Sequence, residues 1–207
     1  MAYYPICLNL KSKKCIVVGG GTIAERKVLA LIDCGAKITV ISPKLTKLLE
    51  RLKPEGKIEH IEREYKKGDL EGAFLVIGAT DNPLVNEVIY EEAGILNLLV
   101  NIVDVPERCN FIVPSIMRRG DLLLSISTSG NAPALAKKIR LDLEKKFGPE
   151  YGPYLNLLGE IREKIKLKYK CVDERSKAWN RILESDILNL VKNGEDELVK
   201  ERIKECI

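Results

Sequence analysis

Residues 14–26 place a short apolar run, three glycines and the start of a helical pattern in immediate succession. Residues 16–18 read Ile-Val-Val, which is typical of a parallel strand covered on both faces. The glycines at 19–21 follow at once, and residues 24–32 carry apolar side chains at helical spacing. A strand, a turn and a helix in this order favour an α/β fold, in which the turn lies at the carboxyl edge of a parallel sheet.

The spacing Gly19-x-Gly21-x-x-Ala24 fits the fingerprint of dinucleotide-binding turns, with alanine in the place of the third glycine. Gly19 permits the tight turn, Gly21 lets a pyrophosphate approach the backbone, and Ala24 keeps the helix close to the strand. The helix N-terminus offers N–H groups and a partial positive charge to the phosphates. An ordinary strand-to-helix turn can have the same spacing. The residues that follow are therefore needed to distinguish a dinucleotide-binding turn from an ordinary one.

That continuation is a second strand. Gly35 closes the helix, and residues 38–41 are the β-branched run Ile-Thr-Val-Ile, which completes a βαβ unit. The acidic residue that usually ends the second strand is missing, because Ser42, Pro43 and Lys44 stand there. The rule that separates NAD from NADP at this position therefore does not apply.

The composition excludes several classes of protein. The chain has 207 residues, 45% of them hydrophobic and 31% charged, which suits a globular protein with one large or two small domains. A net charge of +4 is too small to indicate a nucleic-acid partner. No apolar run approaches the roughly 20 residues that span a membrane. Residues 1–5 lack the pattern of a signal peptide.

Cysteine and histidine usage argues against a metal centre. The six cysteines are scattered without a C-x-x-C pair, and we expect reduced thiols of a cytoplasmic protein. Cys15 and Cys34 fall in expected core elements. His60, the only histidine, lies on a polar strand and is expected at the surface.

The pattern up to Asp104 alternates between strands and helices. We therefore expect a Rossmann-like, doubly wound parallel sheet with right-handed crossovers. The helix after the apolar run 73–79 should begin with Asn82 as N-cap and Pro83 at its first position. The further elements expected are strands at 6–10 (at the sheet edge), 58–61, 73–79 (central) and 98–103, and helices at 45–52 and 83–94.

The character of the chain changes after Asp104. A turn at 115–121 should lead into an antiparallel strand at 122–127, and a helix should follow at 133–147. The remainder is helical, at 154–169, 175–193 and 195–206, as a small bundle. We expect three parts: a dinucleotide-binding domain at 1–112, a small α+β segment at 113–147 and a helical domain at 148–207.

Ligands of open α/β sheets bind outside the carboxyl ends of the strands. Besides the glycine turn, Thr80 and Asp81 fall there, as do Asn101 and Asp104. Asp104 follows an apolar strand, where desolvation would make a carboxylate a usable base. The alternatives are that Asp104 caps the loop before Pro106, and that Asp81 caps a helix.

A second strand-to-helix turn has small polar residues and a basic surrounding. The turn comprises Ser127, Thr128, Ser129 and Gly130, and the nearby cations are Arg118, Arg119, Lys137, Lys138 and Arg140. Free N–H groups would make it an anion site, and the cations would orient a substrate with several carboxylates. The alternative is a capping loop flanked by solvated lysines.

Over residues 3–147 the sequence resembles the precorrin-2 dehydrogenase family, which forms the N-terminal module of siroheme synthase. The most specific motifs are Asn101-x-Val-Asp104 with Cys109-x-Phe-x-x-Pro114, and Ser127-Thr-Ser-Gly-x-x-Pro-x-Leu-Ala136. The motifs at 17–27, 35–43 and 79–81 add to the likeness.

This resemblance implies oxidation of precorrin-2 to sirohydrochlorin with NAD as hydride acceptor, and in some members insertion of ferrous iron. NAD would be held by the glycine turn with Thr22 and Ile23, by residues 42–44, and by Thr80 and Asp81. Asp104 would be the general base. The tetrapyrrole would contact Asn101, Arg118, the turn 127–130 and Lys137. The family also implies a homodimer with an interlocked central segment, here residues 113–147.

Two other functions remain open at this stage. A nucleotide-sensing regulatory module without catalysis has a similar turn, but usually keeps the acid after the second strand that is absent here. An iron chelatase alone would leave the glycine turn unexplained.

Overall fold

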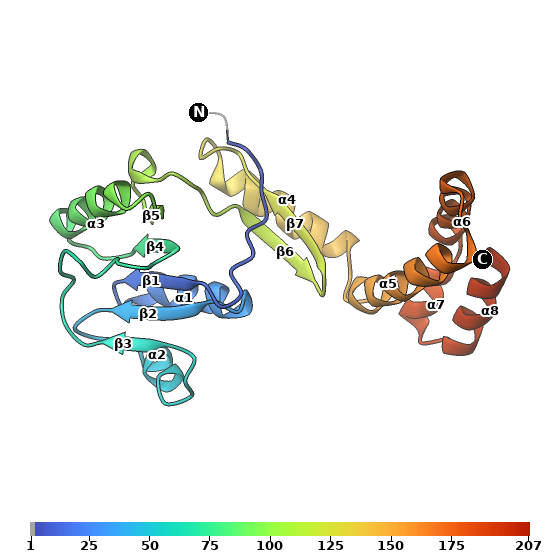
Figure 1. Cartoon of the computed structure of the whole chain (residues 1–207), viewed down its shortest axis with the longest axis horizontal. Coiled ribbons are helices and arrows are strands. Elements are labelled where there is room, and N and C mark those ends of the chain that lie inside the picture. The colour runs from blue at the N-terminus through green and yellow to red at the C-terminus, as the bar shows by residue number, and fades with distance from the viewer. Residues whose placement is uncertain (1–2) are drawn as a thin grey trace. The chain divides into compact units, whose positions relative to one another are not determined.

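The computed structural model describes residues 3–207. Met1 and Ala2, at the start of the segment in which we expect no signal peptide, lie outside the described residues. The chain forms two compact units, which divide between Val113 and Pro114 (Figure 1).

The first unit contains a parallel sheet of five strands in the order β3-β2-β1-β4-β5 (Figure 1). The strands are β1 (Lys14–Val18), β2 (Lys37–Ile41), β3 (Glu59–Ile61), β4 (Leu75–Gly78) and β5 (Leu99–Ile102). The chain proceeds from β1 to one edge and then returns to the other side of β1, which places the topological switch point between β1 and β4. The doubly wound sheet is thus confirmed.

Helices cover both faces of this sheet. They are α1 (Thr22–Asp33), α2 (Lys47–Leu52) and α3 (Pro83–Ile95). Successive strand residues point to opposite faces, so Val17 packs in one core cluster with Ala24 and Val28 of α1, and Val18 packs in another with Ile89 of α3. Burial of every β1 residue after Lys14 agrees with the apolar run in the sequence.

The expected edge strand at 6–10 is wrong. Within the described chain, residues 3–10 have no regular secondary structure, and of the alternating apolar residues only Leu10 is buried. Ile6 is 62% exposed. The alternation resembles a strand, but one buried side chain does not supply the apolar face that would hold a strand against the sheet.

The second unit begins with an antiparallel hairpin of β6 (Ser115–Arg119) and β7 (Leu122–Ile126). The turn expected at 115–121 is therefore mostly strand. Helix α4 (Pro133–Lys146) packs on β6, as Figure 1 shows. Helices α5 (Tyr151–Lys168), α6 (Val172–Glu184), α7 (Ile187–Asn193) and α8 (Asp196–Cys206) follow.

The single helix expected at 175–193 is two helices. Ser185 ends α6, because its hydroxyl donates to the Ile182 carbonyl (2.7 Å) and accepts from the Ile187 N–H (3.4 Å). A serine that bonds the backbone in this way competes with the helix ladder. The break lets side chains of α5, α6, α7 and α8 share one core, which includes Ile161, Ile182, Ile187 and Ile203.

All six cysteines are free thiols, and Cys15 and Cys206 are buried. Between residues 3 and 207, no helix has the length and apolarity needed to cross a membrane.

Candidate active site

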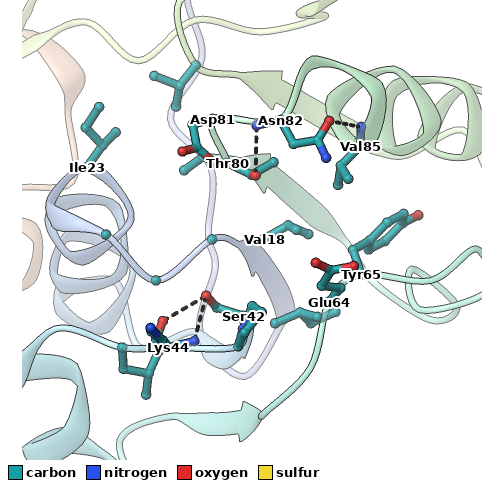
Figure 2. A pocket seen from close by; sticks show the side chains of 18 of the residues that line it. Val18, Ile23, Ser42, Lys44, Glu64, Tyr65, Thr80, Asp81, Asn82 and Val85 are labelled. Carbon is teal, nitrogen blue, oxygen red and sulfur yellow. Dashed lines mark hydrogen bonds between the residues drawn. The ribbon is translucent and has the colours of Figure 1, made fainter.

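A cavity of about 890 Å³ opens at the carboxyl edge of the parallel sheet in the first unit (Figure 2). Its wall brings together segments that follow β1, β2, β3, β4 and β5. The cavity is lined by most of the residues that we predicted to bind the cofactor, and by the predicted base. They are Gly19, Gly21, Thr22, Ile23, Ser42, Pro43, Lys44, Thr80, Asp81 and Asp104. Ala24 is instead fully buried against the core, which suits its predicted role in holding α1 close to β1.

Gly19 and Gly21 differ in whether the fold itself requires a glycine. Gly19 has φ +114°, and a Cβ there would collide with the Ala79 carbonyl, so the fold itself requires this glycine. At Gly21, by contrast, a Cβ would meet no atom within 4 Å. Since the protein's own packing does not require glycine at that position, the open space in front of the turn suits a group that approaches from the cavity.

The N-terminus of α1 faces the same turn. Gly21 is its N-cap and supplies no side-chain hydrogen bond, and the first helical bond runs from the Glu25 N–H to the Gly21 carbonyl (2.9 Å). The N–H groups of the first turn have no acceptor inside a helix. They and the helix dipole suit an anion, so the residues present fit the pyrophosphate of a dinucleotide.

The segment after β2 is fastened to the glycine turn. The Thr46 N–H donates to the Gly20 carbonyl (3.0 Å), and the Ser42 hydroxyl donates to the Lys44 carbonyl (2.8 Å). His60 was expected at the surface but is half-buried, and its Nε2 lies 2.9 Å from the Ser42 carbonyl. These bonds hold residues 42–46 as a rigid wall of the cavity and leave the Lys44 ammonium exposed.

Asn82, and not Asp81, caps α3. Its Oδ1 accepts from the Leu84 N–H (3.0 Å), and Pro83 is the first helical residue, as predicted. Thr80 is fixed by the Asn86 amide, which donates to the Thr80 carbonyl (3.0 Å). The capping alternative for Asp81 is therefore wrong, and its exposed side chain is left at the cavity (Figure 2).

Asp104 follows β5 with a left-handed backbone, φ 60°. This conformation is uncommon for residues other than glycine and is found at functional sites more often than elsewhere. The side chain is exposed and lines the cavity. Among the hydrogen bonds of residues 3–207, none involves its carboxylate. The alternative prediction, that Asp104 caps the loop before Pro106, is therefore wrong.

Two titratable groups beside Asp104 were not predicted. Lys27 on α1 is half-buried, and burial, followed by the charge of Arg26, lowers its pKa; Asp104 and Cys109 act in the opposite direction. The Cys109 thiol donates to the Ile102 and Val105 carbonyls (both 3.2 Å) and so braces the turn that carries Asp104. Burial raises the pKa of this thiol. Both residues lie in motifs that carry the family resemblance, but no role at the site was predicted for either.

Asn101 is not brought to the cavity. It is buried in β5, and its amide donates to the Phe111 carbonyl (3.1 Å), which fastens the loop after the 3-10 turn at 106–108 to the sheet.

The other predicted substrate residues lie in the second unit. Ser127 Oγ accepts from the Ser129 N–H (3.0 Å) and Thr128 Oγ1 from the Ala132 N–H (3.1 Å), which occupies two of the N–H groups expected to serve an anion. Gly130 and Ser129 both have positive φ. Arg118 on β6 and Lys137 on α4 are exposed. Of the other cations in the cluster, Arg140 pairs with Glu144 and Arg119 bonds the Phe147 carbonyl.

Sequence reasoning also missed part of the cavity wall. The loop after β3 contributes Glu64 and Tyr65, and other segments add Leu45, Thr46, Val85 and Val103. Glu64, Tyr65 and Val85 carry no motif, because they reach the cavity through tertiary contacts alone.

Three protein-family models match the chain. "Putative NAD(P)-binding" matches residues 6–115, "Sirohaem biosynthesis protein central" residues 119–146, and "Sirohaem synthase dimerisation region" residues 150–207.

Among curated proteins, a siroheme synthase of Methylobacillus flagellatus is 38% identical over 207 residues, which is 100% of this chain and 44% of that protein. Siroheme synthase 3 of Aeromonas hydrophila is 39% identical over 188 residues, 91% of this chain and 40% of that protein. The chain thus spans less than half the length of these relatives. A solved structure of SirC, precorrin-2 dehydrogenase, superposes with a TM-score of 0.80 at 27% identity, covering 99% of this chain and 98% of that one.

Proposed function

This chain belongs to the putative NAD(P)-binding family and is a relative of the siroheme synthases, and we propose that it is an NAD-dependent precorrin-2 dehydrogenase. The observation that carries the proposal is the open space at Gly21, before a helix N-terminus without a side-chain cap, in the same cavity as Asp104. The likeness to a precorrin-2 dehydrogenase over nearly the whole of both chains supports the choice of substrate.

Each wall of the cavity would have a task in this reaction. The first-turn N–H groups of α1 would hold the pyrophosphate of NAD, and residues 42–44 and 80–81 would flank it. When bound, NAD supplies the acceptor for a hydride. Asp104, at the far side of β1 from β2, would take the proton that leaves a second atom of the substrate as one of its carbons gives up a hydride. Lys27 lies within electrostatic range of Asp104.

The proposed substrate is a tetrapyrrole that carries carboxylates. Exposed Arg118 and Lys137 and the turn 127–130 would orient these groups.

We also propose a homodimer through the segment 113–147, to which the match of residues 150–207 to a dimerisation region adds support. The six free thiols favour a cytoplasmic site of action. Insertion of ferrous iron into the product, with the iron as a substrate, is a proposed second activity.

An anaerobic assay tests the reaction. Purified protein is mixed with precorrin-2 and NAD, and NADH and the absorption spectrum of sirohydrochlorin are followed together. We expect both to appear in equal amounts. Binding of NAD without turnover of precorrin-2 would instead support a nucleotide-sensing module. A parallel sample with ferrous ion shows whether siroheme forms faster than in buffer alone.

A further inference from the structure

The loop that follows β3 is held by two separate anchors. The Arg63 guanidinium donates two hydrogen bonds to the Asp69 carboxylate (2.7 Å each) and a third to the Glu64 carbonyl (2.9 Å). On the other side, the Tyr65 hydroxyl donates to the Glu92 carboxylate of α3 (2.5 Å). The residue between these anchors, Glu64, therefore has a fixed backbone.

The anchor on α3 is itself built into the core. Glu92 is 5% exposed, and its carboxylate also accepts from the N–H groups of Gly68 and Leu70 (3.0 and 3.2 Å). The Tyr65 ring packs against the core cluster that lies between the sheet and α3. A carboxylate with this many donors is satisfied by the fold, so Glu92 serves the loop and not a ligand.

Glu64 itself has a different surrounding. Its side chain is exposed and lines the same cavity as Val18 at the end of β1 (Figure 2). The hydrogen bonds of the described residues use the Glu64 backbone and not its carboxylate. A carboxylate on a fixed backbone that lines a ligand cavity can accept a hydrogen bond from a bound ligand.

The sheet order indicates which part of a ligand would meet it. Asp104 follows β5 and Glu64 follows β3, and these strands are the two edges of the sheet, with β1 between them. A dinucleotide in such a fold lies across the crevice, with one half on each side of the central turn. If the nicotinamide faces Asp104, as the proposed function requires, then the adenosine half faces Glu64.

We infer that Glu64 is a specificity residue of the cofactor site, whose carboxylate accepts a hydrogen bond from the adenosine half of NAD. This inference rests on the proposed function. It supplies, from the loop after β3, the acidic group that is missing after β2. Two donors of adenosine have the required chemistry, the ribose hydroxyls and the exocyclic amine of adenine. Lys44 stands in the same cavity and would attract a 2′-phosphate, so the preference between NAD and NADP depends on both charges.

Calorimetric titration of the full chain tests the inference with three ligands. They are NAD, NADP, which has a phosphate on the 2′-hydroxyl, and nicotinamide hypoxanthine dinucleotide, which lacks the amine. The variants are Glu64→Gln, which removes the charge, and Glu64→Ala, which removes the acceptor. Glu62→Gln is the matched control, because Glu62 is an exposed acid of the same loop that does not line the cavity.

We expect Glu64→Ala to weaken NAD binding by about 10-fold or more, as for other hydrogen bonds to a charged group, and Glu62→Gln to leave it unchanged. A loss of discrimination against NADP in the Glu64 variants assigns the ribose hydroxyl as donor. A loss of discrimination against the hypoxanthine analogue assigns the amine. The inference is overturned if neither discrimination changes, including the case in which all three affinities fall equally.

The same titrations separate the two proposals. A wild-type protein that binds none of the three dinucleotides overturns both the cofactor assignment and the role of Glu64. A wild-type protein that binds NAD and oxidises precorrin-2, while the Glu64 variants bind all three ligands as it does, overturns the role of Glu64 alone.

Discussion

Gly19 and Gly21 stand two residues apart in one turn, and the absence of a side chain has a different physical reason at each. Gly19 needs a positive φ and has the Ala79 carbonyl where a Cβ would be. Gly21 has φ −82° and open space. The first glycine is a requirement of folding, and the second is a requirement of the ligand that we propose.

The two alanine variants should therefore behave differently. Gly19→Ala is expected to lower the free energy of unfolding by about 1–3 kcal/mol, the typical cost of a strained backbone, with the steric clash in addition. Gly21→Ala should change stability by less than about 0.5 kcal/mol but weaken NAD binding by about 10-fold. Urea unfolding and calorimetry measure these quantities. Equal stability losses in both variants would contradict the assignment of Gly21 to the ligand.

Asp104 should matter for the reaction and not for binding of the cofactor. Asp104→Ala is expected to retain NAD affinity and to lower kcat by about 100- to 10,000-fold, the usual contribution of a general base. Glu107→Gln, an exposed acid in the next turn, is the matched control. Single-turnover kinetics with precorrin-2 checks the prediction, and normal turnover by Asp104→Ala would remove this residue from the mechanism.

At the scale of elements, the strand β1 and the loop after β3 contrast in how they are held. β1 is held by its buried apolar side chains and by its pairing with β2 and β4, and its first apolar residue is a cysteine. Burial, assisted by Cys34, raises the pKa of Cys15 to about 11. Cys15 should therefore resist thiol reagents near neutral pH in the native state, while the exposed Cys7 and Cys171 react.

Mass spectrometry after brief labelling, in buffer and in urea, tests this expectation. Label on Cys15 in buffer, at the rate seen for Cys171, would mean that the β1 core opens readily and is not the rigid centre of the sheet.

The loop after β3 is held by charge, so its stability should depend on pH. The Arg63 guanidinium holds the pKa of Asp69 below its ordinary value of 3.8. A depressed pKa in the folded state stabilises the fold fully above pH 3.8 and loses this contribution as pH falls through the folded value. Wild type should thus exceed Asp69→Asn in stability at neutral pH, and the gap should close below pH 3.8. A gap that is independent of pH would rule out the charge as its source.

These two elements also show what a sequence can predict. The β1 turn and α1 could be predicted because their signals are local: an apolar run, glycines at fixed spacing and helical periodicity within 20 residues. The loop after β3 could not, because Tyr65 meets Glu92 from 27 positions away and Glu64 has no pattern around it. The prediction of a strand at 6–10 was wrong for the converse reason. The local alternation of apolar residues was present, but these residues do not pair with a strand of the sheet.

At the scale of the whole molecule, the residues that we propose for cofactor and for substrate fall in different parts of the chain. The cavity belongs to the unit that ends at Val113, and its residues run from Val18 to Asp104. The cations and the second polar turn belong to the unit that begins at Pro114.

The central claim is that the first-turn N–H groups of α1 hold a pyrophosphate, with a nicotinamide beside Asp104. A crystal structure of the protein with NAD tests it most directly. We predict that the phosphates bind at Gly21 and Thr22, that the nicotinamide contacts Asp104 and that the adenosine lies beside Glu64. Phosphates bound away from this turn, or a nicotinamide on the β3 side of the cavity, would contradict it.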